Sequence, residues 1–362
     1  MKRRRVHSTE APINATRRTL LQGTLALVGG SAIASSLGSF PAGVLLAQAR
    51  GAAASAATGT QLILLGTQGG PNVNLQRGEA ASAVLAAGAP YLVDCGYGTL
   101  RALVQAGLRI ADVTSVFVTH LHDDHTSDVA ALISHKWTGG SAATGPAATT
   151  VYGPYGTAGL VEGALAFLKA NIDIRTVDEG RTIKPATVFK GRDLSAAKVT
   201  EVFRDERVVV RAVENTHFPD RARAKMAYRS LAYRFITPDR SIVFSGDTAY
   251  SPGLIELARD ADVLVCEAMD TVLRAELLKT AQSAPGGLNI ESVERHIVET
   301  HSTTEDVGKM AAEARVKMVV LNHLLPGANA QRGGPIPDER YIEGVRKYFS
   351  GQVIVGVDRM RL

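Results

Sequence analysis

The sequence predicts an α/β fold in which two facing sheets carry helices on their outer sides, a four-layer αββα sandwich. Residues 60–362 alternate apolar, β-branched runs with segments of helical periodicity, and glycine and proline separate them. Strand-like runs are concentrated in the early half, whereas both halves carry helix-like segments. Histidines and acids gather where several strand-like runs end. These observations fit two packed sheets with a site at one edge of the sandwich.

The first 49 residues are expected to be an export signal and not part of the fold. Residues 2–5 are basic, and residues 16–21 (TRRTLL) resemble a twin-arginine export motif. No charge occurs from 19 to 48, and residues 47–49 (AQA) form a small-x-small cleavage site. A membrane anchor is the alternative, because the uncharged stretch is long enough to span a bilayer. Cleavage would give an exported, periplasmic or secreted protein with no stable membrane span.

The remaining elements are expected in a single domain over residues 60–362, joined to the leader by a loose linker at 50–59 that is rich in small residues. A glycine-rich cluster at 66–71 predicts a turn. A capping box, Ser302-x-x-Glu305, is expected to open the helix before the last strands. Apolar runs predict strands at 61–65, 81–85, 91–95, 115–119, 208–213, 262–266 and 352–357, and helical periodicity predicts helices at 99–107, 156–171 and 303–314.

The charge balance argues against a nucleic-acid partner. The chain has 40 basic and 35 acidic residues, but six of the basic residues and one acidic residue lie in the leader, which leaves 34 of each. A neutral domain with scattered charges is a poor candidate for nucleic-acid binding, for which a basic face is expected. The two cysteines, Cys95 and Cys266, lie in apolar runs and are expected to be small buried hydrophobic residues, with a disulfide as the alternative in an exported protein.

The most informative motif is residues 120–125, which read His-Leu-His-Asp-Asp-His directly after a strand-like run. Imidazole nitrogens and carboxylate oxygens are the usual ligands of catalytic zinc. His120 and His122 are two residues apart and can share one metal ion. Asp124 and His125 follow at the turn and can face a second ion. The motif therefore predicts a metal centre at the end of this strand.

This motif resembles the H-x-H-x-D-H motif of the metallo-β-lactamase superfamily. The resemblance implies a further histidine for the first metal, a bridging aspartate and a last histidine for the second metal, in that order. The chain supplies His217, Asp247 and His323, each after a strand-like run. The implied ligands are His120, His122 and His217 for metal one, Asp124, His125 and His323 for metal two, and Asp247 between them. Mostly nitrogen and oxygen ligands suit two zinc ions, with manganese or iron as alternatives.

Within that superfamily the chain is most similar to the ribonuclease Z-like branch, which includes secreted arylsulfatase-type enzymes and phosphodiesterases. The similar segments are residues 65–71, 245–248 (SGDT), 262–268 and 301–303 (HST). True class B β-lactamases have a cysteine where Asp247 stands, which argues against that activity. Ribonuclease Z itself is disfavoured because residues 154–216 lack a lysine- and glycine-rich arm and because the leader predicts export.

The resemblance also implies a mechanism. The two metals share a water, lower its pKa and deliver hydroxide to sulfur, phosphorus or carbon in line with the leaving group. His301 is the candidate general acid, and Glu267 is expected to hold its tautomer and raise its pKa through a hydrogen bond. Asp124 is expected both to bind metal and to orient the nucleophile. The alternatives are a helix-terminal role for His301 and a simple ion pair for Glu267.

The expected protein is an exported dinuclear zinc hydrolase of small sulfate or phosphate esters, arylsulfatase-like or phosphodiesterase-like. A lactonase or other carboxylic-ester hydrolase is the alternative enzyme, and a metal-free binding protein is the alternative outside catalysis. Loops at 136–150, 218–228 and 324–336 are expected to shape the substrate pocket. The expected partner is a small-molecule ester, with no nucleic acid, and the resemblance implies a homodimer.

Overall fold

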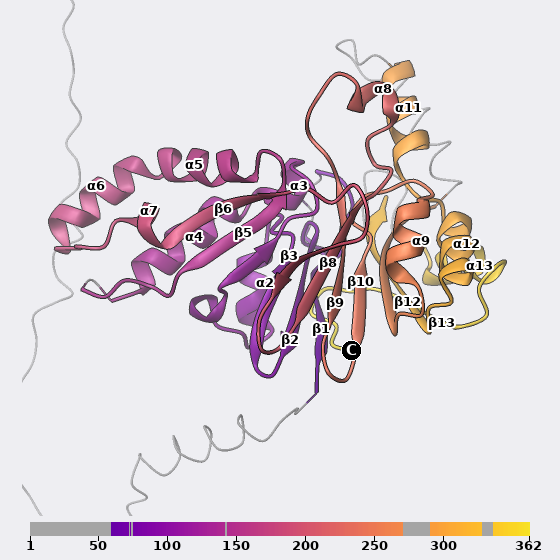
Figure 1. Cartoon of the computed structure of the whole chain (residues 1–362), viewed down its shortest axis with the longest axis horizontal. Coiled ribbons are helices and arrows are strands. Elements are labelled where there is room, and N and C mark those ends of the chain that lie inside the picture. The colour runs from indigo at the N-terminus through magenta and orange to yellow at the C-terminus, as the bar shows by residue number, and fades with distance from the viewer. Residues whose placement is uncertain (1–58, 72, 74, 142, 271–289, 328–335) are drawn as a thin grey trace, which may run out of the picture. The chain divides into compact units, whose positions relative to one another are not determined.

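The computed structural model describes residues 59–71, 73, 75–141, 143–270, 290–327 and 336–362. This part of the chain forms two sheets that pack face to face, with helices on both outer sides (Figure 1). The predicted α/β sandwich of four layers is therefore confirmed. The predicted leader and all but the last residue of the predicted linker lie outside the described residues.

The first sheet has six strands in the spatial order β1-β2-β3-β4-β5-β6. The pairs β1–β2 and β2–β3 are antiparallel, and the remaining pairs are parallel. Because β3, β4 and β5 run in one direction, their carboxyl ends meet at one edge of the sheet. The strands are β1 (Gln61–Gly66), β2 (Ala81–Ala86), β3 (Ala89–Val93), β4 (Ser115–Phe117), β5 (Thr149–Pro154) and β6 (Phe189–Leu194).

The second sheet has seven strands in the order β13-β12-β11-β10-β9-β8-β7. The strands β10 to β13 are parallel to one another, and β7 to β10 pair antiparallel. As a result, β8, β10, β11 and β12 all end at the same edge. The strands are β7 (Thr200–Arg204), β8 (Val209–Glu214), β9 (Leu231–Ile236), β10 (Ser241–Phe244), β11 (Val263–Met269), β12 (Met318–Leu325) and β13 (Gln352–Val355).

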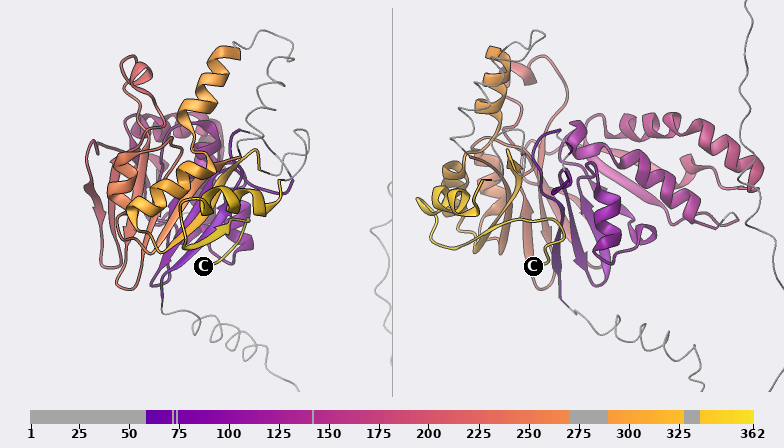
Figure 2. Two further views of the ribbon diagram at one scale, coloured as in Figure 1. Left: turned by 90° about the vertical axis from the view of Figure 1, so that its right-hand side faces the viewer. Right: turned by 180° about the vertical axis from the view of Figure 1, so that it is seen from behind.

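The helices cover the outer faces of the two sheets, as the side and rear views show (Figure 2). Residues of α2, α4 and α5 pack on the first sheet, and residues of α9, α12 and α13 pack on the second. The helical elements are α2 (Thr99–Gln105), η1 (Ile110–Asp112), α3 (Asp123–Thr126), α4 (Val129–Gly139), α5 (Thr157–Phe167), α6 (Lys169–Asp178), α7 (Pro185–Val188), α8 (Asp220–Arg223), α9 (Pro252–Ala258), α11 (Ile290–Thr300), α12 (Thr304–Ala314) and α13 (Asp338–Arg346).

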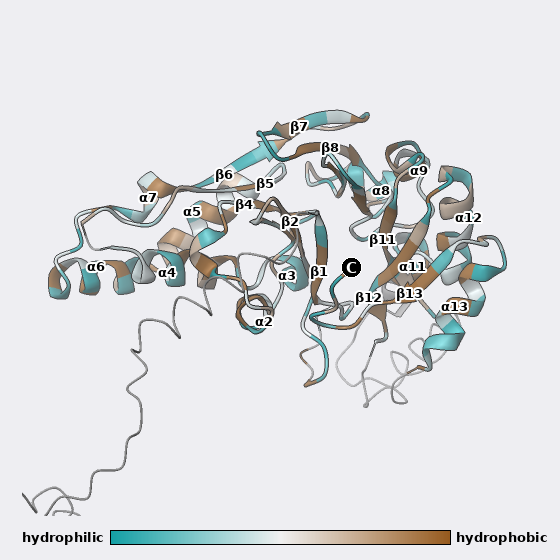
Figure 3. Ribbon diagram, turned by 90° about the horizontal axis from the view of Figure 1, so that it is seen from below, coloured by the Kyte–Doolittle hydropathy of each residue, from teal (hydrophilic) through white to brown (hydrophobic). Residues whose placement is uncertain are grey.

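An aromatic core holds the two sheets together. The fully buried Phe117 of β4 stacks on Tyr152 of β5 at 5.1 Å between ring centroids. It also makes edge-to-face contacts with Tyr233 and Phe235 of the second sheet, at 5.7 and 5.2 Å between ring centroids. The apolar side of the second sheet and the polar surface of its outer helix are seen in Figure 3, where β12 and β13 are hydrophobic and the outer side of α13 is hydrophilic. Aromatic rings bury large areas, so this cluster fixes how one sheet sits on the other.

The start of α12 differs from the prediction by one residue. Thr303 is the N-cap: its hydroxyl accepts from the Asp306 N–H, and the Asp306 carboxylate accepts from the Thr303 N–H. The predicted pair, Ser302 and Glu305, does not form the box because the Ser302 hydroxyl donates to the Thr248 carbonyl. The capping box is therefore real and begins one residue later.

Both cysteines are buried and free, as expected for small hydrophobic residues. Trp137 is buried in the core, and its Nε1–H donates to the Ile183 carbonyl at 3.0 Å. No helix among the described residues is both long enough and apolar enough to cross a membrane.

Candidate metal centre

Residues from both sheets meet at the shared edge. The motif at 120–125 begins in the loop after β4 and continues into α3, while His217 follows β8 and Asp247 follows β10. His323 lies within β12. The structure thus brings together all seven residues that the sequence singled out, and six of them are fully buried.

The first group of possible ligands is His120, His122, His217 and Asp247, and one ligand atom from each lies within 4.8 Å of the others. The Nδ1 atom of His122 is 2.9 Å from His120 Nε2 and 3.3 Å from His217 Nε2. Three imidazole nitrogens that converge on one point are typical of a shared metal ion.

The second group is Asp124, His125 and His323, with ligand atoms again within 4.8 Å. His323 Nε2 lies 3.2 Å from both Asp124 Oδ2 and Asp247 Oδ1. His125 Nε2 lies 3.2 Å from the same Asp247 oxygen. The other oxygen of Asp247 faces the first group, 3.9 Å from His120 Nε2. One carboxylate oxygen therefore faces each group, which is the geometry expected of a bridging residue.

The donor atoms of these groups fit metal ions. Among the described residues, His125 Nε2 and Asp247 Oδ1 are buried and make no hydrogen bond. Buried polar atoms in folded proteins nearly always have a partner, so buried donor atoms that converge without a hydrogen bond fit a metal-binding role. The donor types agree, because imidazole nitrogens and carboxylate oxygens together attract a divalent cation, which displaces any proton that the imidazoles carry.

The pKa directions place His120, His217 and Asp247 in their metal-binding forms. Burial lowers the pKa values of His120 and His217 well below the usual range, and neighbouring histidines add to the effect. Burial alone would raise the pKa of Asp247, but His323 and His125 hold it well below its usual value. These side chains are therefore ready to bind metal without first losing protons.

His323 is aimed at the site by a bulge in its strand. The pairing of β12 with β11 skips it: Asn322 faces Glu267 and Leu324 faces Ala268. Its φ of 41° lies in the left-handed region, which is rare for residues other than glycine. Bulges and strained residues gather at functional sites, where they redirect a side chain.

The sequence reasoning missed Asp94, which orients His125. Asp94 Oδ2 lies 2.9 Å from His125 Nδ1, and Oδ1 accepts from the Thr119 N–H at 2.7 Å. A carboxylate on the outer nitrogen fixes the tautomer of a ligand histidine and leaves the inner nitrogen free for metal. Asp94 falls inside the strand predicted at 91–95, so an acidic residue in an apolar run was its only signal. The His217 ring has a similar partner in the Thr300 carbonyl, 3.1 Å from its Nδ1 atom.

The proposed general acid has the predicted partner but not the predicted pKa. His301 follows α11, and its Nδ1 atom lies 2.8 Å from Glu267 Oε2. Glu267 also accepts from the Thr248 N–H. The expectation that Glu267 raises the pKa of His301 is wrong: burial lowers it, with Asp247 opposing. Burial and Asp247 raise the pKa of Glu267 itself well above its usual value.

His296 is a second residue near the site that no sequence motif indicated. It lies on α11, exposed, with its ring 5.4 Å from the His301 ring and 5.9 Å from the His217 ring. Its spacing of five residues before His301 matches no motif, so only the fold could place it beside the metal centre.

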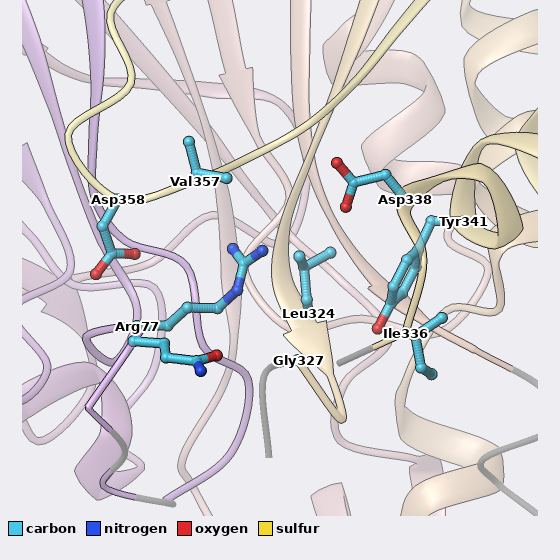
Figure 4. A pocket seen from close by; sticks show the side chains of 9 residues that line it. Arg77, Leu324, Gly327, Ile336, Asp338, Tyr341, Val357 and Asp358 are labelled. Atoms are coloured by element: carbon cyan, nitrogen blue, oxygen red, sulfur yellow. The ribbon is translucent and has the colours of Figure 1, made fainter. Parts of the chain in front are cut away.

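A cavity of about 710 Å³ opens beside His122. Of the three loops expected to shape the pocket, only 218–228 contributes among its described lining residues; the others come from 121–122, the start of α5 and Asp193. A smaller cavity of about 200 Å³ lies near Leu324, Tyr341 and Arg77 (Figure 4). None of the described residues from 136 to 150 lines either cavity, and Trp137 packs into the core with its helix.

The sandwich fold and the two joined groups of ligands define a metal-dependent hydrolase that acts on ester bonds. Residues 90–324 match the family described as the beta-lactamase superfamily domain, and the chain belongs to this superfamily. The resemblance inferred from the sequence is thereby confirmed.

The chain is similar to the ribonuclease Z of Mycolicibacterium paratuberculosis, at 28% identity over 302 residues, which are 83% of this chain and 97% of the relative. Two solved structures share the fold. The metallo-beta-lactamase fold protein YhfI from Bacillus subtilis has a TM-score of 0.56 at 18% identity and covers 84% of this chain and 99% of its own. The short form of human tRNase Z has a TM-score of 0.52 at 21% identity and covers 83% and 98%.

Proposed function

We propose that this chain is an exported dinuclear zinc hydrolase of small phosphate or sulfate esters. The observation that carries the proposal is Asp247, whose two oxygens face two separate groups of buried ligands. The pair formed by His301 and Glu267 lies beside them, with His301 Nδ1 4.0 Å from Asp247 Oδ2.

Zinc suits the donor set. The ligands are imidazole nitrogens and carboxylate oxygens, and in the described part of the chain neither group contains a thiolate. Such a set holds zinc well, with manganese or iron as alternatives. When bound, the two ions supply an activated water and neutralise charge that builds up on the ester oxygens.

The surrounding residues have separate roles in the proposed reaction. His301 gives its Nε2 proton to the leaving oxygen, and the hydrogen bond between its Nδ1 atom and Glu267 holds the ring in that tautomer. Burial lowers the pKa of His301 and raises that of Glu267, so Glu267 holds a proton beside Nδ1. As the Nε2 proton leaves, the Glu267 proton moves to Nδ1 and the ring stays neutral. Asp124 orients the attacking water from its place among the ligands.

The relatives favour phosphorus as the reacting atom. They are named ribonuclease Z, and a ribonuclease cleaves phosphodiester bonds. RNA is a weaker candidate than a small ester for this chain, because residues 50–362 carry no net charge. Sulfate esters and carboxylic esters, including lactones, remain the competing substrate classes.

Turnover of bis-(4-nitrophenyl) phosphate and 4-nitrophenyl sulfate by the zinc-loaded protein separates these classes. Faster diester cleavage supports a phosphodiesterase, and faster sulfate cleavage supports an arylsulfatase-like enzyme. Inactivity on both, with two zinc ions bound per chain, would reject the proposal in favour of a lactone or carboxylic-ester substrate. Sedimentation of the same sample tests the proposed homodimer.

Export rests on the twin-arginine-like motif. Replacing Arg17 and Arg18 together by lysine should keep the protein inside the cell, whereas Arg3→Lys with Arg4→Lys should not. Fractionation of cells expressing each variant measures the distribution. N-terminal sequencing of the exported wild type should give Arg50. Equal export of both variants would contradict the proposed route.

A further inference from the structure

The cavity beside His122 has a mainly apolar wall. We call it the His122 pocket. Its volume of about 710 Å³ lies within the range of about 300–1,000 Å³ typical of small-molecule sites. The described lining residues are Leu121, His122, Tyr155, Gly156, Gly159, Leu160, Asp193, Phe218, Met226 and Tyr228. Most of these side chains are aliphatic or aromatic, so the pocket favours an apolar group.

The pocket offers little to an anionic group. None of its described lining residues is a lysine or an arginine. Its carboxylate, Asp193, accepts from the Gly156 N–H at 3.1 Å and the Ala158 N–H at 2.8 Å, and so holds the start of α5. Phosphate groups are most often bound by cationic side chains, and the described lining residues include no lysine or arginine. A chain of phosphates is therefore a poor occupant.

The pocket is continuous with the metal centre. His122 belongs to both, and the Phe218 ring lies 5.7 Å from the His122 ring and 6.1 Å from the His120 ring. Tyr155 and Tyr228 are 57% and 47% exposed and lie 5.9 Å apart. Large aromatic residues left exposed beside a reactive centre are typical of a surface that a ligand covers.

We propose that the His122 pocket binds the uncharged aryl or branched alkyl group of the substrate while its ester group reaches the metal centre. The inference rests on the proposed ester hydrolysis and adds the substrate class: a compact ester with one apolar substituent.

Two glycines on α5 allow a matched test. A Cβ atom added at Gly159, which lines the pocket, would meet nothing within 4 Å. Gly163 lies one turn later on the same helix and is also exposed, and a Cβ atom added there would likewise meet nothing within 4 Å. It is not among the residues that line the pocket. Leucine at either position has a better helix propensity than glycine, so both variants should fold. Only Gly159→Leu should fill the pocket.

The test measures binding of phenylphosphonate and methylphosphonate to the full chain loaded with zinc, by titration calorimetry. The wild type should bind phenylphosphonate at least about tenfold more tightly, because the phenyl ring leaves water. Gly159→Leu should abolish this preference without changing the Kd of methylphosphonate, and Gly163→Leu should retain it. Equal binding of both probes, no binding of either, or equal effects of the two variants would overturn the proposal.

The binding test is separate from the test of the proposed function. If the wild type prefers phenylphosphonate but hydrolyses no phosphate or sulfate ester, the proposed reaction is rejected and the apolar pocket stands. If it hydrolyses these esters without a phenyl preference, the reaction stands and the pocket is rejected.

Discussion

Asp94→Asn should weaken metal binding while leaving the backbone in place. The φ of Asp94 is 60°, and asparagine adopts this conformation more readily than most residues. In the wild type, one carboxylate oxygen accepts a hydrogen bond from the Thr119 N–H and the other accepts one from His125 Nδ1–H. An amide has a single oxygen, so one of these two partners must face an NH₂ group instead.

The loss of affinity is expected at the second metal site. If the amide nitrogen faces His125 Nδ1, the ring must carry its proton on Nε2, the atom that lies 3.2 Å from Asp247 Oδ1 among the ligands. A protonated nitrogen has no lone pair for a metal ion. Loss of such an outer partner reduces metal affinity about 10–100-fold, or roughly 1.4–2.8 kcal/mol.

Competition with a chromogenic chelator at pH 7 would measure the affinity of each of the two sites. The control is Asp239→Asn, which also replaces a carboxylate that accepts a backbone N–H, from Thr60 at 2.8 Å, but lies in the turn between β9 and β10. Unchanged affinity at both sites in Asp94→Asn, or an equal loss in the control, would refute the role given to Asp94.

Three further predictions follow from other parts of the structure. Phe117→Ala should lower the free energy of unfolding by about 3–5 kcal/mol in urea titrations, because this ring is fully buried, whereas Phe167→Ala, at 79% exposed, should change it little; a similar loss in both would contradict the packing argument. Hydrogen bonds from Thr60 lower the pKa of Asp239 to about 2 from 3.8. Its stabilising effect is therefore complete above the unfolded value and lost as pH falls through about 2, so the deficit of Asp239→Asn in urea titrations should shrink between pH 5 and pH 2; a constant deficit would exclude the ionised carboxylate as its cause. His301→Ala should slow hydrolysis of esters with poor leaving groups by about 10²–10⁴-fold and of nitrophenyl esters far less; equal losses would argue for a positioning role instead.

The fold and the residues at strand ends were predictable because both depend on local patterns. Apolar runs identified the strands before or around His217, Asp247 and His323, and the ends of β8, β10 and β12 meet because these strands run in one direction. The ligand and catalytic roles of these residues stay predictions that the variants above can test.

Residues that depend on long-range pairing were not predictable. Asp94 reaches His125 only because β3 pairs in parallel with β4, with Val93 opposite Phe117. His296 reaches the site only through the placement of α11. The pKa of His301 depends on burial, which a motif does not encode; the motif alone suggested the opposite direction.

The division of ligands between the sheets has a consequence for how firmly the metals are retained. The motif at 120–125 belongs to the first sheet, whereas His217, Asp247 and His323 belong to the second. Metal binding and the packing of the two sheets are therefore thermodynamically linked. When the free metal concentration is 100 times the Kd of one site, binding there adds about 2.7 kcal/mol to the free energy of unfolding of the sandwich. A protein proposed to leave the cell already folded would carry its ions with it. A chelator that removes the ions outside the cell should therefore also lower the free energy of unfolding of the sandwich.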